Sequence, residues 1–186
     1  MIEKKSLYEW CRIAAEDLPS HPDLKIPFRI VNSSSKMGEL MAREFADEIK
    51  HADTVHRPFR AIVPCGPKSW YEPFARIVNS ERISLKDLVV FHMDECLNWE
   101  CGELAEDDPY NFRAFMERYF YGAIDAVLNV PAANRNYLSP RTMEAVREKI
   151  AQTPVDYTLG VGAGRARRVQ PVAQDFVFAR HRRRAV

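Results

Sequence analysis

The sequence has no long hydrophobic run. None of its apolar stretches approaches the ~18 residues that a membrane-spanning helix needs. The N-terminal stretch MIEKKSLYEWCRIAAEDL carries charges throughout and lacks the apolar segment of a signal peptide. These absences argue against an integral membrane protein and a secreted one, so we expect a cytoplasmic protein with no membrane partner.

Cysteine is scarce, and its spacing is irregular. The four cysteines, Cys11, Cys65, Cys96 and Cys101, form no disulfide framework, so we expect reduced thiols. His92 could join Cys96 and Cys101 as a metal ligand, but no second Cys/His pair follows at the spacing of a zinc finger. We therefore expect no metal site and no cofactor.

The composition supports one folded domain with an uneven charge distribution. Hydrophobic residues make up 46% of the chain and aromatic residues 11%, which is enough apolar material for a buried core. The formal net charge is +1, but residues 161–186 contain seven Arg and one Asp, a net +6, which leaves −5 for residues 1–160. The body of the chain is mildly acidic, and only its last segment is basic.

Apolar runs alternate with helical periodicity along most of the chain. The stretch FRIVNSSS (28–35) indicates a short strand and a serine-rich helix N-cap, and residues 35–52 have the apolar spacing of an amphipathic helix. Residues 1–26 indicate a polar helix that ends at prolines. Further strands are expected in residues 59–64, 87–95 and 155–162, and further helices in residues 70–81, 107–124 and 139–152.

Nearly continuous apolar strands that alternate with amphipathic helices favour an α/β fold. We expect a three-layer, Rossmann-like parallel sheet with helices on both faces. The predicted organisation is an N-terminal helical extension (1–27), an α/β domain (28–160) and a basic tail (161–186). Because ligands of such sheets bind at the carboxyl ends of the strands, a site is expected there.

The first candidate site follows the predicted strand 59–64. The stretch VPCGPKSW places Gly66 and Pro67 in a tight turn and Lys68 and Ser69 at the start of a helix. Backbone N–H groups and the helix dipole attract phosphate at such a position, although the spacing is not that of a Walker loop. A generic strand-to-helix turn is the alternative interpretation.

The second candidate site follows the predicted strand 87–95. The stretch VVFHMDEC puts Asp94 and Glu95 just beyond a buried strand. Adjacent carboxylates at such a position can be tuned to act as a proton-abstracting base. The alternative is that they cap the following loop.

Three segments carry a shared pattern: VPCGPKSWYEPF, SLKDLVVFHMDECLNW and EDDPYNFRAFMERYFYGAID. Together they resemble the glucosamine-6-phosphate deaminase/isomerase family, in the same order and at similar intervals. The resemblance extends over residues 28–160, and the Met-Asp-Glu strand end is its strongest element. It implies a small-molecule sugar phosphate ligand with a phosphate site lined by residues 66–69. It also implies a catalytic carboxylate pair, with Asp94, next to Glu95, as the base that moves a proton between C2 and C1 of an open-chain amino sugar phosphate.

The chain departs from the family pattern at several positions. Pro67 stands where the family has Gly or Ser, and it donates no N–H, which weakens the phosphate cradle. Lys68 stands where the family has Thr, and Cys96 where the deaminases have Tyr. The related 6-phosphogluconolactonases have Asp-Glu-Arg at this strand end, so Cys96 favours the deaminases. A lactonase-like hydrolase and a non-catalytic sugar-phosphate-binding regulator are the alternatives.

The segment after the last predicted strand lacks a family motif. The family continues as Leu-Gly-Gly-x-Gly-x-Asp-Gly-His, which supplies the ring-opening histidine, whereas this chain reads LGVGAGRARRVQP. Permitted codons for residues 164–171, read one frame over, encode Asp-Gly-His-Val-Ala-Tyr-Asn. We therefore expect a frame change near residues 160–161, a domain that is incomplete at its C-terminus, and impaired catalysis.

The arginines of residues 161–186 are, on this interpretation, out-of-frame translation and disordered. Nonspecific binding of nucleic acid by this basic tail is the less favoured alternative. A homo-oligomer is left open by the sequence.

Overall fold

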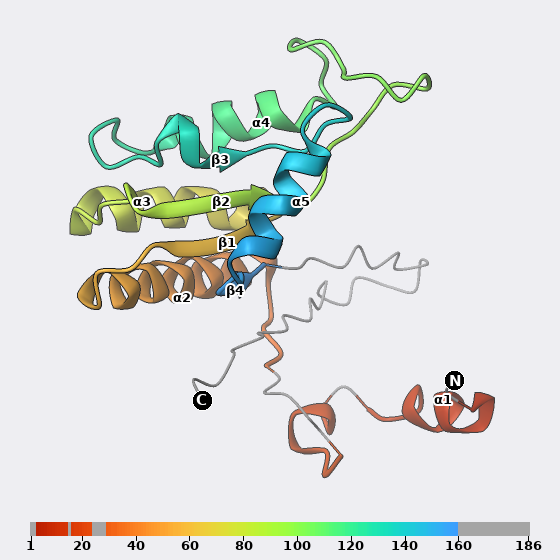
Figure 1. The fold of residues 1–186 in the computed structure, drawn as a ribbon. Helices are drawn as coiled ribbons and strands as arrows, with labels where there is room; N and C mark the ends of the chain where they lie inside the picture. Colours follow the sequence, from red (N-terminus) through yellow and green to blue (C-terminus); the bar gives the residue numbers. More distant parts are fainter. Residues whose placement is uncertain (1–2, 15, 24–28, 160–186) are drawn as a thin grey trace.

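The structure, a computed structural model, describes residues 3–14, 16–23 and 29–159, and a four-stranded parallel sheet lies at its centre (Figure 1). The strands lie in the order β3-β2-β1-β4, and every neighbouring pair is parallel. β1 and β2 pair along their whole length, whereas the two outer strands each add two residues. The strands are β1 (Phe59–Val63), β2 (Leu88–His92), β3 (Arg135–Asn136) and β4 (Tyr157–Thr158).

Helices connect the strands and precede the first one. The α-helices are α1 (Lys4–Trp10), α2 (Ser34–Thr54), α3 (Tyr71–Glu81), α4 (Phe112–Tyr119) and α5 (Met143–Gln152). Short 3-10 helices are η1 (Leu18–Ser20), η2 (Lys68–Trp70), η3 (Tyr121–Ala123) and η4 (Ala132–Asn134). In the part of the chain that the structure describes, no helix has the length and apolar character needed to cross a membrane.

The main hydrophobic core lies between one face of the sheet and the helices α2 and α3. Alternate residues of β1 are buried on this face because side chains along a strand point to opposite sides. The ring of Phe45 from α2 packs against Phe59 of β1, Trp70 of η2 and Phe74 of α3, with centroids 6.0, 5.9 and 5.2 Å away. Each such buried aromatic contributes roughly 1.5–3 kcal/mol, so this cluster stabilises the position of both helices.

The opposite face of the sheet carries α5, which crosses the strands in Figure 1. Val146 is the one buried residue of this helix. Polar contacts supplement it: the Arg60 side chain donates to the Lys149 carbonyl at 2.5 Å, and Lys149 Nζ donates to Asn136 Oδ1 at 2.7 Å. The predicted α/β class, with a parallel sheet and helices on both faces, is confirmed.

One predicted strand is absent from the structure, and one observed strand was not predicted. The short strand predicted within residues 28–35 is wrong over its described part, since residues 29–33 form neither strand nor helix. Val31 packs against the core, but β-branched residues form a strand only where a partner strand completes the ladder. Conversely, β3 was not predicted, because Arg135 and Asn136 have no apolar pattern and pair with Val90 and Phe91 only through tertiary contact.

The ends of the helices follow local capping. α2 begins where Ser33 Oγ accepts from the Lys36 N–H at 3.1 Å, as the serine-rich N-cap predicted. α4 begins at Phe112, later than the predicted residue 107, because Asn111 Oδ1 accepts from the Ala114 N–H at 2.8 Å. The domain boundaries 1–27 and 28–160 remain predictions, and the frame change and the tail 161–186 lie outside the described residues.

Candidate functional site at the carboxyl ends of the strands

The carboxyl ends of β1 and β2 lie next to each other and bring the two candidate segments together. Parallel pairing places Val63 opposite His92, and the Met93 N–H donates to the Val63 carbonyl at 2.9 Å. Two residues beyond the end of each strand, the Cys65 N–H donates to Asp94 Oδ1 at 3.1 Å. The loop after β1 and the carboxylate after β2 are therefore in direct contact.

Asp94 keeps one carboxylate oxygen available. It is half-buried, and its Oδ2 atom has no hydrogen-bond donor among the described residues. The neighbouring Cys65 thiol is a poor nucleophile, because burial, with the charges of Asp94 and Glu95, raises its pKa to about 12 and keeps it protonated at neutral pH. Of the side chains at this strand end, Asp94 is the one placed to accept a proton.

The loop of residues 66–69 has fewer free donors than the sequence suggests. Gly66 has φ +92°, a backbone conformation that side chains other than glycine rarely adopt. Its N–H donates to the Tyr71 hydroxyl, which in turn donates to Met116 Sδ at 3.1 Å. Burial raises the pKa of Tyr71, so this hydroxyl stays protonated. Because Pro67 has no N–H, the first half of the loop offers no backbone donor to a phosphate.

The second half of the loop faces the helices. The Lys68 ammonium lies 3.7 Å from the ring centroid of Tyr119 and 5.4 Å from that of Phe115, both on α4, in cation–π contacts. Ser69 Oγ is buried and has no hydrogen-bond partner in the described part of the chain. The backbone of Ser69 packs directly against Gly38 of α2, where a Cβ atom would lie 2.1 Å from the Ser69 carbonyl oxygen.

Glu95 occupies the N-terminus of α4. Its Oε1 accepts from the Cys96 N–H at 3.0 Å and the Phe112 N–H at 2.7 Å, and its Oε2 accepts from the Arg113 N–H at 2.9 Å. A carboxylate is favourable there because the first N–H groups of a helix lack partners and carry positive partial charge. The structure thus separates the two adjacent carboxylates: Glu95 accepts from the first N–H groups of α4, and Asp94 faces the loop after β1.

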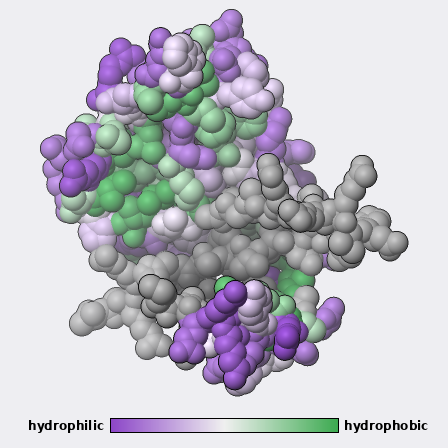
Figure 2. Space-filling model, turned by 90° about the vertical axis from the view of Figure 1, so that its right-hand side faces the viewer, coloured by the Kyte–Doolittle hydropathy of each residue, from purple (hydrophilic) through white to green (hydrophobic). Residues whose placement is uncertain are grey.

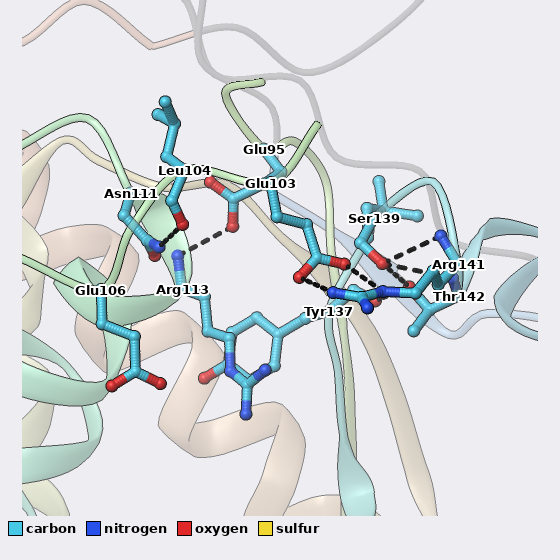
Figure 3. Close-up of a pocket in the computed structure, with 11 residues that line it drawn as sticks. Glu95, Glu103, Leu104, Glu106, Asn111, Arg113, Tyr137, Ser139, Arg141 and Thr142 are labelled. Carbon is cyan, nitrogen blue, oxygen red and sulfur yellow. Dashed lines mark hydrogen bonds and ion pairs between the residues drawn. The ribbon is translucent and has the colours of Figure 1, made fainter. Parts of the chain in front are cut away.

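A cavity of about 270 Å³ opens beside Glu95, between the loop that precedes α4 and the segment that follows β3 (Figure 3). Arg141 binds Glu103 through two hydrogen bonds of 3.1 and 2.7 Å on one side of it. The Arg141 hydrogen bond, followed by one from Ser139, lowers the pKa of Glu103. The lining residues are Glu95, Glu103, Leu104, Glu106, Asn111, Arg113, Tyr137, Leu138, Ser139, Arg141 and Thr142.

Most residues of this cavity were not predicted from the sequence. Arg113 lies in the first turn of α4, within a segment predicted only as a helix. Tyr137 and Arg141 follow a strand that has no apolar signature. The position of Tyr137 and Arg141 after a strand of the parallel sheet is the signal that could have indicated a site there. That signal could be used only if β3 had been predicted.

His92 lies beneath the site and is not available as a ligand. It is buried, its ring stacks on Tyr137 at a centroid distance of 4.1 Å, and its Nε2 lies 3.1 Å from the Tyr121 hydroxyl. Burial, with the positive charge of Arg135, lowers the pKa of His92 to about 3. Within residues 3–14, 16–23 and 29–159, no group of three or more His, Cys, Asp or Glu side chains could hold a metal ion.

The face at which the strands end is mixed in character. Figure 2 views the molecule from this side and shows hydrophobic residues gathered between hydrophilic ones. Met93, Leu97 and Trp99, which follow β2, are exposed by 37%, 41% and 91%. A polar ligand with an apolar surface, such as a sugar ring, is compatible with such a face.

The fold and the position of the site define an α/β protein with a parallel sheet and candidate residues at the carboxyl ends of its central strands. The chain is 29% identical over 133 residues to a glucosamine-6-phosphate deaminase from Tolumonas auensis, an alignment that covers 70% of this chain and 47% of that protein. It thus spans about half the length of this curated relative. No protein-family model matches the chain.

Solved structures share the fold. A monomeric glucosamine-6-phosphate deaminase, described as a missing link of the NagB superfamily, superposes with a TM-score of 0.58 at 18% identity, covering 71% of this chain and 54% of that one. A devB protein gives a TM-score of 0.50 at 17% identity, covering 77% and 70%. The resemblance to the glucosamine-6-phosphate deaminase family that the sequence motifs indicate is confirmed by the curated relative, and the solved structures share the fold.

Proposed function

We propose that this chain binds an amino sugar phosphate at the carboxyl ends of β1 and β2 and derives from a glucosamine-6-phosphate deaminase/isomerase. The observation that carries the proposal is the contact between the two strand ends, in which the Cys65 N–H holds one oxygen of Asp94 and leaves the other available. A carboxylate fixed in this way is suited to remove a proton from a carbon next to a carbonyl group. The related deaminase supports the choice of substrate.

In this proposal Asp94 is the base, and residues 66–69 line the side of the site that faces the phosphate. Gly66 permits the sharp turn, and Lys68 and Ser69 begin η2. Glu95 contributes by holding the start of α4 rather than by exchanging protons. No cofactor is needed for a proton transfer between neighbouring carbons, because the carboxylate itself accepts and returns the proton.

We further propose that turnover is impaired in the chain as it stands. The base needs an open-chain substrate, and the residues after β4 read Leu-Gly-Val-Gly-Ala-Gly-Arg, without the Asp-Gly-His that the family uses for ring opening. A non-catalytic binder of the same sugar phosphate is the second candidate, favoured by this missing motif.

Calorimetric titration with glucosamine 6-phosphate, combined with an ammonia-release assay, tests both parts. We expect the 186-residue chain to bind the ligand and to release little ammonia, and a version with the Asp-Gly-His frame restored to gain turnover. Asp94→Asn in that version should abolish turnover and keep binding, whereas Asp87→Asn, at the opposite end of β2, should change neither. Absence of binding would refute the function, and rapid ammonia release by the chain itself would refute the impairment. Preferential hydrolysis of 6-phosphogluconolactone would instead support the lactonase alternative.

A further inference from the structure

Two consecutive backbone N–H groups of the loop after β1 are held by side chains from two different parts of the fold. The Cys65 N–H donates to Oδ1 of Asp94, which follows β2, at 3.1 Å. The next N–H, that of Gly66, donates to the hydroxyl of Tyr71, the first residue of α3. The candidate base and the Tyr71 hydroxyl are therefore connected through one short stretch of backbone.

Packing does not fix the backbone of Gly66. Apart from its chain neighbours, a Cβ atom placed on this residue would meet no other atom within 4 Å, so Gly66 faces open space. Its φ is +92°, and glycine adopts positive and negative φ values about equally well. The hydrogen bond to Tyr71 therefore holds Gly66 in one of the several conformations that its backbone can adopt.

Tyr71 itself is held firmly. Its side chain is buried, its ring centroid lies 5.3 Å from that of Phe120, and its hydroxyl donates to Met116 Sδ at 3.1 Å. Burial is the largest cause of its raised pKa, and the charges of Cys65 and Asp94 act in the same direction, as expected for a hydroxyl that lies near both. The Tyr71 oxygen thus offers an acceptor at a fixed position beneath the loop.

We propose that Tyr71 is a positioning residue for the candidate base: its hydroxyl fixes the turn at Gly66 and, through it, the Cys65 N–H that orients Asp94. The proposal rests on the proposed function for the role of Asp94 as a base, but not for the hydrogen bonds. Without the hydroxyl, Gly66 is free to take other conformations, and the loop 66–69 and Asp94 lose their fixed separation. A displacement of a reacting group by about 1 Å costs up to roughly a hundredfold in rate.

Solution NMR of the full chain tests the proposal, because the amide proton of Cys65 senses the ionisation of the carboxylate that it binds. In the wild type its chemical shift should change with pH as Asp94 ionises, and in Asp94→Asn this change should be absent. Tyr71→Phe, which removes a single oxygen atom, should reduce the Cys65 response. It should also speed hydrogen exchange of the Gly66 amide about tenfold, the value of one hydrogen bond.

Tyr121→Phe is the matched control, since it removes another buried hydroxyl, one that lies 3.1 Å from His92 Nε2. Urea unfolding should show that the two variants lose similar stability, whereas the Cys65 response should stay at the wild-type level in Tyr121→Phe. An equal decrease in both variants would mean a general loosening of the fold and would overturn the positioning role. Exchange of the Gly66 amide in the wild type as fast as in an exposed loop would overturn it without any variant.

Calorimetric titration of the wild type with glucosamine 6-phosphate separates this proposal from the proposed function. If the wild type binds the sugar phosphate and the Cys65 response is unchanged in Tyr71→Phe, the proposed function stands and the positioning role is overturned. If the response decreases in Tyr71→Phe alone but the wild type does not bind the sugar phosphate, Tyr71 still positions Asp94 and the proposed function fails. If neither result is obtained, both proposals are overturned.

Discussion

The carboxylate of Glu95 links the end of β2 to the start of α4, and its removal should loosen that link. Glu95→Ala leaves the Phe112 and Arg113 N–H groups without acceptors. Loss of a side-chain acceptor at the N-terminus of a helix costs about 1–2 kcal/mol, and we expect a corresponding decrease in the free energy of unfolding measured with urea. Glu100→Ala, which removes an exposed carboxylate of the neighbouring loop, is the control. Equal stability of the two variants would contradict the capping role.

His92 should make the stability of the protein depend on pH. Its pKa is lowered from 6.5 to about 3 in the folded state, so below pH 6.5 the unfolded chain takes up a proton that the folded chain does not. Stability from this group is present above pH 6.5 and is lost as pH falls toward 3, by about 2 kcal/mol between pH 7.5 and 5. Urea unfolding at both pH values should show a smaller difference for His92→Gln. His51→Gln, at an exposed position of α2, is the control and should keep the wild-type difference in the free energy of unfolding between the two pH values. An unchanged difference in His92→Gln would contradict the role of His92.

At the scale of the elements, α2 approaches η2 so closely that only glycine fits at residue 38. Alanine is normally the better residue in a helix, by up to ~1 kcal/mol. Here its Cβ would lie 2.1 Å from the Ser69 carbonyl oxygen, a backbone atom that cannot rotate away. We expect Gly38→Ala to destabilise the protein by about 2–3 kcal/mol in thermal or urea unfolding. Ser35→Ala, at an exposed position of the same helix, is the control, and its free energy of unfolding should stay within ~0.5 kcal/mol of the wild-type value. A Gly38→Ala variant more stable than the wild type would show that α2 and η2 can move apart.

The elements that could be predicted are those whose signal is local. β1 and β2 are nearly continuous apolar runs, and α2 has both a serine cap and apolar spacing, so their types follow from the sequence alone. β3 has no such pattern and exists because Arg135 and Asn136 pair with β2. The contact between Cys65 and Asp94 follows from two strand ends in one parallel sheet. The cavity beside Glu95 does not follow from the sequence, because it forms only where the loop before α4 meets the segment after β3.

At the scale of the whole molecule, the three tryptophans report on different regions. Trp70 is fully buried in the core, whereas Trp10 and Trp99 are exposed by 51% and 91%. A variant with Trp10→Phe and Trp99→Phe should therefore show blue-shifted fluorescence that is weakly quenched by acrylamide. If the core unfolds in one cooperative step, its red shift on unfolding should coincide with the loss of far-ultraviolet circular dichroism. Strong quenching of the native variant would mean that the aromatic core is open to solvent.

The two faces of the sheet are stabilised unequally, and this has a consequence for how the folded molecule opens. α2 and α3 share an aromatic core, whereas α5 contributes one buried side chain and a few polar contacts. Regions with little buried apolar surface open at lower free energy than the core does. Native-state hydrogen exchange should accordingly replace the amide protons of α5 long before those of α2, so that β1 is uncovered on the Arg60 side while the aromatic layer remains closed.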